Sequence, residues 1–123
     1  MGAGLYLHVP FCRRKCPYCN FYSVPAQPEL LTAYTAAVCR NLRHYGNAAQ
    51  PERVDTVYFG GGTPSLLPPA QIAQILETAA EQFTLSADAE ITLEANPATV
   101  TPEQLRELRH AGINRLSLGV QSL

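Results

Sequence analysis

The chain has 123 residues, of which 46% are hydrophobic, and a formal net charge of −1 at pH 7. This length suits one hydrophobic core and one domain, and the balanced charge gives no indication of a nucleic acid or an acidic membrane surface as a partner. No apolar run reaches the roughly 18 residues of a membrane-spanning helix. The N-terminus also lacks the basic and apolar regions of a secretory signal.

Strands and helices are predicted to alternate along the first two thirds of the chain. The apolar run 5–9 predicts a strand that stops at Pro10. Apolar residues at helical spacing predict a helix over 29–45, with Gly46 as its C-cap. The β-branched and aromatic run 54–59 predicts a second strand. A second helix is expected from the prolines at 68–69 to about residue 83.

The same alternation continues to the end. Residues 90–95 predict a third strand, and the segment 101–104 has the pattern of a capping box with a proline at N1. A helix is therefore expected to begin there and to end before Gly112, and residues 115–120 predict a fourth strand. The order β-α-β-α-β-α-β predicts an α/β fold with a parallel sheet and right-handed crossovers.

Chemistry-bearing residues follow the strands in this scheme. A cysteine loop follows the first strand and the segment 60–64 follows the second, while Glu94 ends the third and Gln121 follows the fourth. Because β/α folds place ligands at the carboxyl ends of parallel strands, these residues are expected to share one pocket.

The cysteine loop holds Cys12, Cys16 and Cys19 in the spacing C-x₃-C-x₂-C. A four-iron cluster normally takes four cysteine ligands, so three leave one iron open for chemistry. The basic residues at 13–15 favour the thiolate form. The alternative is a structural zinc site with His8 or Cys39 as fourth ligand, although zinc sites usually show two cysteine pairs or a cysteine pair with a histidine pair.

The four cysteines are grouped three and one, which is not a disulfide framework, and reduced thiols predict a cytoplasmic location. Cys39 lies in a helical pattern, where we expect a small buried hydrophobe. The histidines at 8, 44 and 110 show no partner in the sequence and are interpreted as structural.

Three consecutive glycines precede Thr63 and Pro64, so one backbone bend carries no side chains. Such a bend lets the main chain approach a ligand closely. It lacks the Gly-Lys-Ser/Thr ending of a P-loop and the spacing of dinucleotide-binding folds. A tight turn is the alternative, but three glycines favour a ligand site. Glu94 could be merely solvated or capping; its place at a strand end favours a polar contact with the ligand.

The cysteine loop and its flanks, from Tyr6-Leu7-His8-Val9-Pro10-Phe11-Cys12 to Cys19-Asn20-Phe21-Tyr22-Ser23, closely resemble the opening of radical S-adenosylmethionine (SAM) enzymes. Within that family the resemblance is to oxygen-independent coproporphyrinogen III oxidases and HemW-type haem chaperones. It implies that the chain is the N-terminal part, about four strands over 1–123, of a partial (β/α) barrel of six strands.

The resemblance also implies cofactors and their ligands. Three irons of a [4Fe-4S] cluster would be held by the cysteine triad, and the fourth would bind SAM. A reduced cluster, supplied with electrons by a flavodoxin- or ferredoxin-like protein, would cleave SAM to a radical that abstracts hydrogen. No side chain is assigned as catalytic. The residues implied to contact SAM or to line its site are Tyr6, Tyr18, Gly61, Gly62, Thr63, Glu94 and Gln121. From the sequence alone, Tyr6 and Tyr18 would be ordinary core aromatics.

Three functions remain open at this point. Coproporphyrinogen-oxidising members carry a fourth cysteine two residues after the third, where this chain has Phe21. This favours the HemW type, which implies haem binding and delivery rather than porphyrin biosynthesis by oxidation. A non-catalytic zinc-binding module is the alternative of another class. Because four strands cannot close a barrel, we expect a truncated domain whose last strand leaves an unpaired edge, which is an aggregation liability.

Overall fold

The computed structural model describes residues 3–12, 24–25, 27–48, 53–97 and 100–118. One parallel sheet has the order β1 (Ala3–Val9), β4 (Arg53–Gly61), β5 (Thr84–Ala95) and β6 (Arg115–Leu118). A second, two-residue parallel pair is formed by β2 (Phe11–Cys12) and β3 (Val24–Pro25). The helical elements are α1 (Pro28–Ala48), the 3₁₀ turn η1 (Pro64–Leu66), α2 (Pro69–Gln82) and α3 (Pro102–Ala111).

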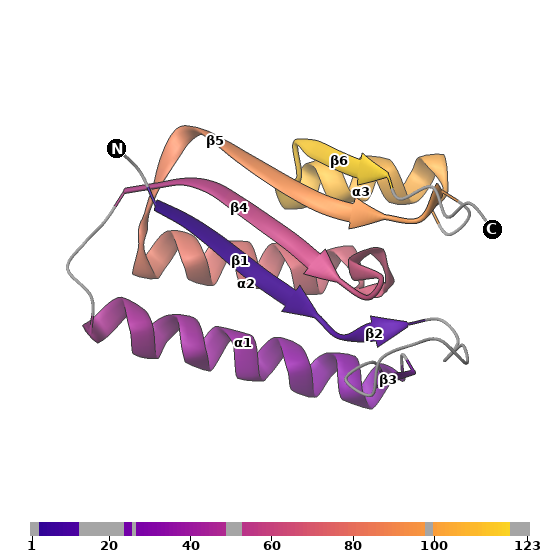
Figure 1. The fold of residues 1–123 in the computed structure, drawn as a ribbon, viewed down its shortest axis with the longest axis horizontal. Coiled ribbons are helices and arrows are strands. Elements are labelled where there is room, and N and C mark those ends of the chain that lie inside the picture. Colours follow the sequence, from indigo (N-terminus) through magenta and orange to yellow (C-terminus); the bar gives the residue numbers. More distant parts are fainter. Residues whose placement is uncertain (1–2, 13–23, 26, 49–52, 98–99, 119–123) are drawn as a thin grey trace.

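The predicted α/β alternation is confirmed. The four long strands lie in chain order and all run the same way, so their arrowheads point to one end of the molecule, where β2 and the turn after β4 also lie (Figure 1). The connections between strands are helical, as parallel neighbours require. No helix in the described part of the chain is long and apolar enough to cross a membrane.

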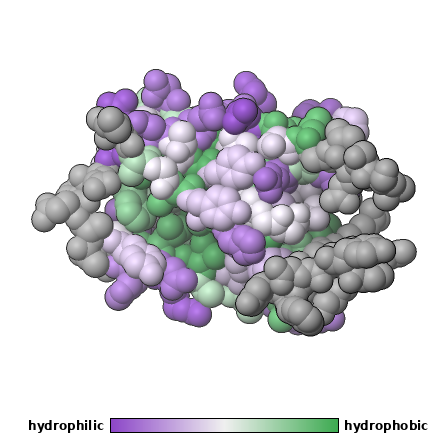
Figure 2. All heavy atoms as spheres, viewed as in Figure 1, coloured by the Kyte–Doolittle hydropathy of each residue, from purple (hydrophilic) through white to green (hydrophobic). Residues whose placement is uncertain are grey.

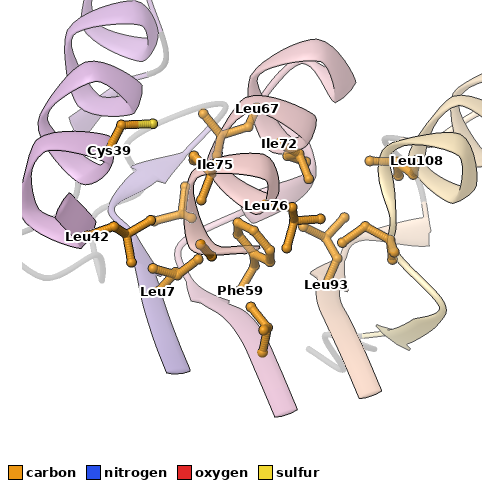
Figure 3. Packing of buried hydrophobic residues seen from close by; sticks show 14 of the residues in the cluster. Leu7, Cys39, Leu42, Phe59, Leu67, Ile72, Ile75, Leu76, Leu93 and Leu108 are labelled. Carbon is orange, nitrogen blue, oxygen red and sulfur yellow. The ribbon is translucent and has the colours of Figure 1, made fainter. Parts of the chain in front are cut away.

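One face of the sheet forms the hydrophobic core with the helices. Leu7, Phe59 and Leu93 occupy aligned positions on β1, β4 and β5, and Phe59 and Leu93 are completely buried. Figure 3 shows these side chains directed toward the helices, with Ile75 and Leu76 of α2 opposite them. Since burying one such side chain contributes about 1.5–3 kcal/mol, this layer fixes which face of each strand turns inward.

The alternate residues of the strands lie on the other face, which no helix covers in the described part of the chain. Tyr6 pairs in register with Tyr58, which pairs with Thr92. Tyr6 is 60% exposed, so its interpretation as a core aromatic is wrong. Figure 2 shows hydrophobic and weakly polar side chains next to one another over the middle of the molecule in this view, and hydrophilic ones along its upper and lower rims.

The largest corrections to the predicted boundaries concern the end of the first helix and the start of the third strand. α1 continues through Gly46 to Ala48, so this glycine is not a C-cap. Its backbone has no positive φ, and a Cβ there would lie 2.6 Å from the Cβ of Gln82, at the end of α2. Gly46 therefore serves close packing between two helices. β5 begins at Thr84, six residues before the predicted start.

The start of α3 is as predicted, but its capping box is only half formed. The Thr101 hydroxyl accepts a hydrogen bond from the Gln104 amide at 3.1 Å. The Gln104 side chain does not reach back to Thr101 and instead donates to the carbonyl oxygen of Ser65 in η1, at 3.2 Å. α3 ends at Ala111 and is capped by Gly112, whose φ of 123° suits the predicted glycine stop.

Candidate functional site

The glycine turn, residues 60–64, begins in the last two residues of β4 and packs backbone to backbone against the carboxyl end of β1. Gly62 donates its N–H to the carbonyl oxygen of Val9 at 2.8 Å, and Thr63 donates to that of Phe11 at 2.7 Å. A Cβ on Gly62 would lie 2.4 Å from the Phe11 oxygen, and one on Gly61, whose φ is 113°, would lie 2.7 Å from the Val9 oxygen. Contact between two segments of the chain thus requires these glycines, whereas the sequence had suggested close approach to a ligand.

This packing positions the start of the cysteine loop. Cys12 follows Phe11 in β2, and β2 pairs with β3 so that Cys12 lies opposite Pro25. The residues that flank segment 13–23 are therefore paired with each other beside the carboxyl end of β1. The Tyr34 hydroxyl of α1 donates to the carbonyl oxygen of His8, and the Tyr34 ring meets the Phe11 ring edge-on at 5.4 Å, so α1 fixes the same exit.

The remaining cysteines of the triad, Cys16 and Cys19, lie outside the described residues, as do Tyr18, Phe21 and Gln121. Among the described residues, no group of three His, Cys, Asp or Glu side chains is placed to hold a metal. The prediction of a three-cysteine metal centre therefore stays a prediction.

Glu94 is held over the glycine turn from two sides. Its Oε1 accepts the N–H of Gly61 at 3.1 Å, and its Oε2 accepts the hydroxyl of Tyr58 at 2.7 Å. This carboxylate raises the pKa of Tyr58, because it favours the protonated phenol, and a hydrogen bond from Ser117 acts in the opposite direction. Glu94 is thus neither merely solvated nor a helix cap.

A pocket of about 210 Å³ opens beside this carboxylate, at the carboxyl ends of β4, β5 and β6. It is lined by Gly61, Gly62, Thr63, Pro64, Glu94, Ala95, Asn96 and Ser117. The structure therefore brings four sequence-predicted residues together at the edge where they were expected. The volume is below the 300–1,000 Å³ of pockets that enclose a whole small molecule, so the described lining suits one polar end of a ligand.

The described lining of the pocket carries a negative charge, which favours a positively charged ligand group. The amides of residues 61–63 already donate to Glu94, Val9 and Phe11, so they do not form an anion-binding nest. The carboxylate of Glu94 is the one formally charged side chain among the described lining residues. An ammonium group fits this donor and acceptor set, and a phosphate does not.

Tyr6 lies beside the pocket rather than in its described lining. Its ring stacks on the Tyr58 ring, with centroids 5.9 Å apart and an interplanar angle of 15°. The His8 ring is 6.2 Å from the Tyr6 ring and borders Gly61, where a Cβ would meet it at 2.9 Å. Tyr6 and His8 thus present an exposed aromatic surface next to the glycine turn.

Cys39 is confirmed as a core residue. It is 2% exposed and belongs to the hydrophobic core (Figure 3). Its sulfur accepts a hydrogen bond from the Thr78 hydroxyl at 3.4 Å. A thiol packed between α1 and α2 in this way is poorly placed to be the fourth ligand of a zinc site at Cys12. This weakens one of the two zinc arrangements that the sequence left open.

Tyr58 and Ser117 are site residues that local sequence patterns do not indicate. Tyr58 belongs to a predicted strand, and it shares the open face with Glu94 because it pairs with Thr92, two residues before Glu94 on β5. Ser117 pairs in register with Glu94 itself. The two-residue alternation of side chains along a strand shows which residues share a face. It identifies Tyr58 and Ser117 as neighbours of Glu94 only when the register between the strands is known.

Comparison with known proteins gives consistent matches. The family described as "Radical SAM superfamily" matches residues 6–123. The chain is 42% identical over 120 residues to "Heme chaperone HemW" of Escherichia coli, covering 97% of the chain and 32% of that protein. It is 43% identical over 122 residues to "Radical S-adenosyl methionine domain-containing protein 1, mitochondrial" of Mus musculus, covering 98% of the chain and 27% of that protein.

A solved structure is also similar. It is described as coproporphyrinogen III oxidase (HemN) from Escherichia coli, a radical SAM enzyme. The TM-score is 0.85 at 34% sequence identity, and the match covers 96% of this chain and 27% of that one. The chain therefore spans about a third or less of the length of these proteins.

Proposed function

Because the chain belongs to the radical SAM superfamily, we propose that it binds a [4Fe-4S] cluster through Cys12, Cys16 and Cys19 and binds SAM beside it. The observation that carries this proposal is the pocket at Glu94. It lies next to the strand exit that leads to Cys12, and its one formal charge among the described lining residues suits the ammonium of an amino acid.

The described residues have distinct parts in this proposal. The turn at Gly61, Gly62 and Thr63 and the carboxylate of Glu94 hold the amino group of the methionine part of SAM. Tyr6 offers an exposed ring to the rest of the ligand or to the cluster. Tyr18 and Gln121 complete the proposed set. The bound cluster supplies one-electron reduction, with electrons from a flavodoxin- or ferredoxin-like protein.

We further propose that the chain acts in haem binding and delivery, because two of its relatives, from Escherichia coli and Synechocystis, are named heme chaperones. Phe21 stands where the resemblance places the fourth cysteine of porphyrinogen-oxidising members, which favours haem delivery over oxidation. The similarity to HemN keeps coproporphyrinogen oxidation as a second candidate. Thiolate ligands are maintained in a reducing compartment, which supports a cytoplasmic location.

The first experiment measures iron, acid-labile sulfide and zinc after anaerobic reconstitution of the chain. We expect about four irons and four sulfides per chain, lost in Cys16→Ala. Cys39→Ala is the matched control, because that cysteine lies in the core, and it should keep the cluster. Zinc without sulfide in the wild-type chain would refute the cluster and support the zinc-binding module.

A second experiment tests the pocket by equilibrium dialysis of SAM against the reconstituted chain. Glu94→Gln removes the charge that faces the ammonium and should weaken binding about tenfold or more, since hydrogen bonds to charged groups contribute about 1.5–3 kcal/mol. Glu90→Gln is the control: Glu90 lies on the same face of β5, but it pairs with Arg115 at 3.1 Å and does not line the pocket. If Glu94→Gln and Glu90→Gln weaken SAM binding equally, the proposed site is wrong.

Haem and porphyrin assays separate the two candidate functions. Haem delivery predicts that the reconstituted chain binds haem, seen as a Soret band that titrates with added haem, without anaerobic turnover of coproporphyrinogen. Turnover of coproporphyrinogen would establish the oxidase instead.

A further inference from the structure

The carboxylate of Glu94 is held in one orientation by two donors on β4. The Tyr58 hydroxyl binds Oε2 at 2.7 Å and the Gly61 amide binds Oε1 at 3.1 Å. A free glutamate side chain samples several rotamers, and fixing it costs about 1.5–2 kcal/mol of conformational entropy. Because a carboxylate has about four acceptor sites, two donors leave the remaining sites for a ligand in the pocket.

The Tyr58 ring is itself held in place. It stacks on the Tyr6 ring at 5.9 Å, and it lies against the bare backbone of Gly60, where a Cβ would come within 3.0 Å of its Cε1 atom. The ring is therefore held by contacts with β1 and β4 while its hydroxyl donates to Glu94 on β5.

Glu94 keeps its negative charge available. Among the described residues it forms no ion pair, and Arg115, two residues before its register partner Ser117 on β6, is engaged by Glu90 at 3.1 Å. The Tyr58 hydroxyl and the Gly61 amide orient the carboxylate without neutralising it, as two neutral donors do. This arrangement is suited to a cationic ligand group, which can then supply the countercharge.

We propose that Tyr58 is a positioning residue for the ligand of this pocket: by donating to Oε2 it turns the free acceptor sites of Glu94 toward the ligand's ammonium group. This rests on the proposed function, in which the ligand is SAM. Tyr58 acts through Glu94 and is not in the described lining of the pocket. Its effect is therefore confined to the part of the ligand that Glu94 contacts.

The test compares two ligands on the reconstituted chain. SAM carries the ammonium group, and 5′-methylthioadenosine lacks the whole amino-acid part. We expect Tyr58→Phe to raise the dissociation constant of SAM about 3- to 30-fold and to change that of 5′-methylthioadenosine by less than about twofold. Tyr45→Phe, at a tyrosine that is 63% exposed on α1, is the matched control and should change neither.

A double-variant cycle shows whether Tyr58 acts through Glu94. In a Glu94→Gln background, Tyr58→Phe should have little further effect on SAM binding, because the oriented charge is already absent. A pH titration at 295 nm checks the contact itself. The titration of Tyr58 is obtained by subtracting the curve of the matching chain that carries Tyr58→Phe. Because the Glu94 carboxylate raises the pKa of Tyr58, Glu94→Gln should shift this titration to lower pH.

The outcomes distinguish the two proposals. A wild-type chain that holds no cluster or binds no SAM refutes the proposed function, and the role of Tyr58 with it. A wild-type chain that binds SAM, with Tyr58→Phe weakening both ligands equally, shows a merely structural role. Unchanged SAM binding in Tyr58→Phe, or additive effects in the double variant, likewise overturns the positioning role while leaving the function intact.

Discussion

Gly62→Ala should separate the glycine turn from the exit of β1. The added Cβ would lie 2.4 Å from the Phe11 oxygen and 3.0 Å from its carbonyl carbon, and both are backbone atoms. An ordinary contact requires the two segments to move apart by about 1 Å. That movement breaks or weakens the hydrogen bonds from Gly62 to Val9, at 2.8 Å, and from Thr63 to Phe11, at 2.7 Å.

The expected loss of stability follows from those two hydrogen bonds. A backbone hydrogen bond contributes about 0.5–1.5 kcal/mol net, so losing two lowers the free energy of unfolding by about 1–3 kcal/mol. Urea unfolding followed by circular dichroism measures this, with a midpoint expected about 1 M lower. Because the same movement displaces Cys12, the iron content after reconstitution should also fall.

Gly4→Ala is the matched control. Its Cβ would meet the Thr56 hydroxyl at 2.6 Å, a nominal clash of similar size, but that atom ends an exposed side chain that can rotate away. Gly4 also has no positive φ. We expect a change within about 0.5 kcal/mol, or slight stabilisation because alanine restricts the unfolded chain. If Gly62→Ala costs no more than Gly4→Ala, the backbone contact does not hold the turn and the reasoning is wrong.

Three further predictions concern the scaffold. Thr101→Ala removes the N-cap of α3 and should cost about 1 kcal/mol in urea unfolding, with Thr101→Ser as the control that keeps the hydroxyl. Asn114→Ala removes two 2.8 Å side-chain hydrogen bonds to the backbone of β5 and should cost about 1–3 kcal/mol, with faster amide exchange at Ile91; unchanged exchange there would contradict it. Burial raises the pKa of Tyr34 to about 12, so its contribution to stability is complete below about pH 10 and is lost as the pH rises toward 12. Tyr34→Phe should remove one phenol titration near pH 12 at 295 nm and flatten the loss of stability in that window, and an unaltered alkaline profile would refute this.

Local patterns were sufficient for the order of elements and for the shared edge of the site. Apolar runs predicted all four strands of the main sheet, and α2 lies where the second helix was expected, with Ile72, Ile75, Leu76 and Ala79 buried at helical spacing. The rule that parallel strands present ligands at their carboxyl ends then placed Glu94 beside the glycine turn, as the structure has it.

Element boundaries depended on contacts that local patterns do not contain. β5 starts early because Thr84 and Leu85 pair with Arg53 and Val54, after which the register shifts before Thr56. Asp55 accepts hydrogen bonds from Arg53 and from Ser86 at this irregularity. Polar residues there carry no strand pattern of their own, so only the partner strand makes them β structure.

The glycines show where the chemistry of a motif cannot be derived from its residues alone. The sequence predicted a bare backbone and assigned it to a ligand, but Gly61 and Gly62 are bare chiefly because the backbone of Val9 and Phe11 lies against them. The amides of residues 61–63 are occupied by these contacts and by Glu94, so they cannot bind an anion. The charge of the pocket's described lining is therefore set by Glu94, which favours a cation. Glu94 depends in turn on Tyr58, which is two residues from the turn on β4 and on a different strand from Glu94. The preference for a cation is thus a property of the register of three strands, and a change that leaves every motif intact but shifts that register would abolish it.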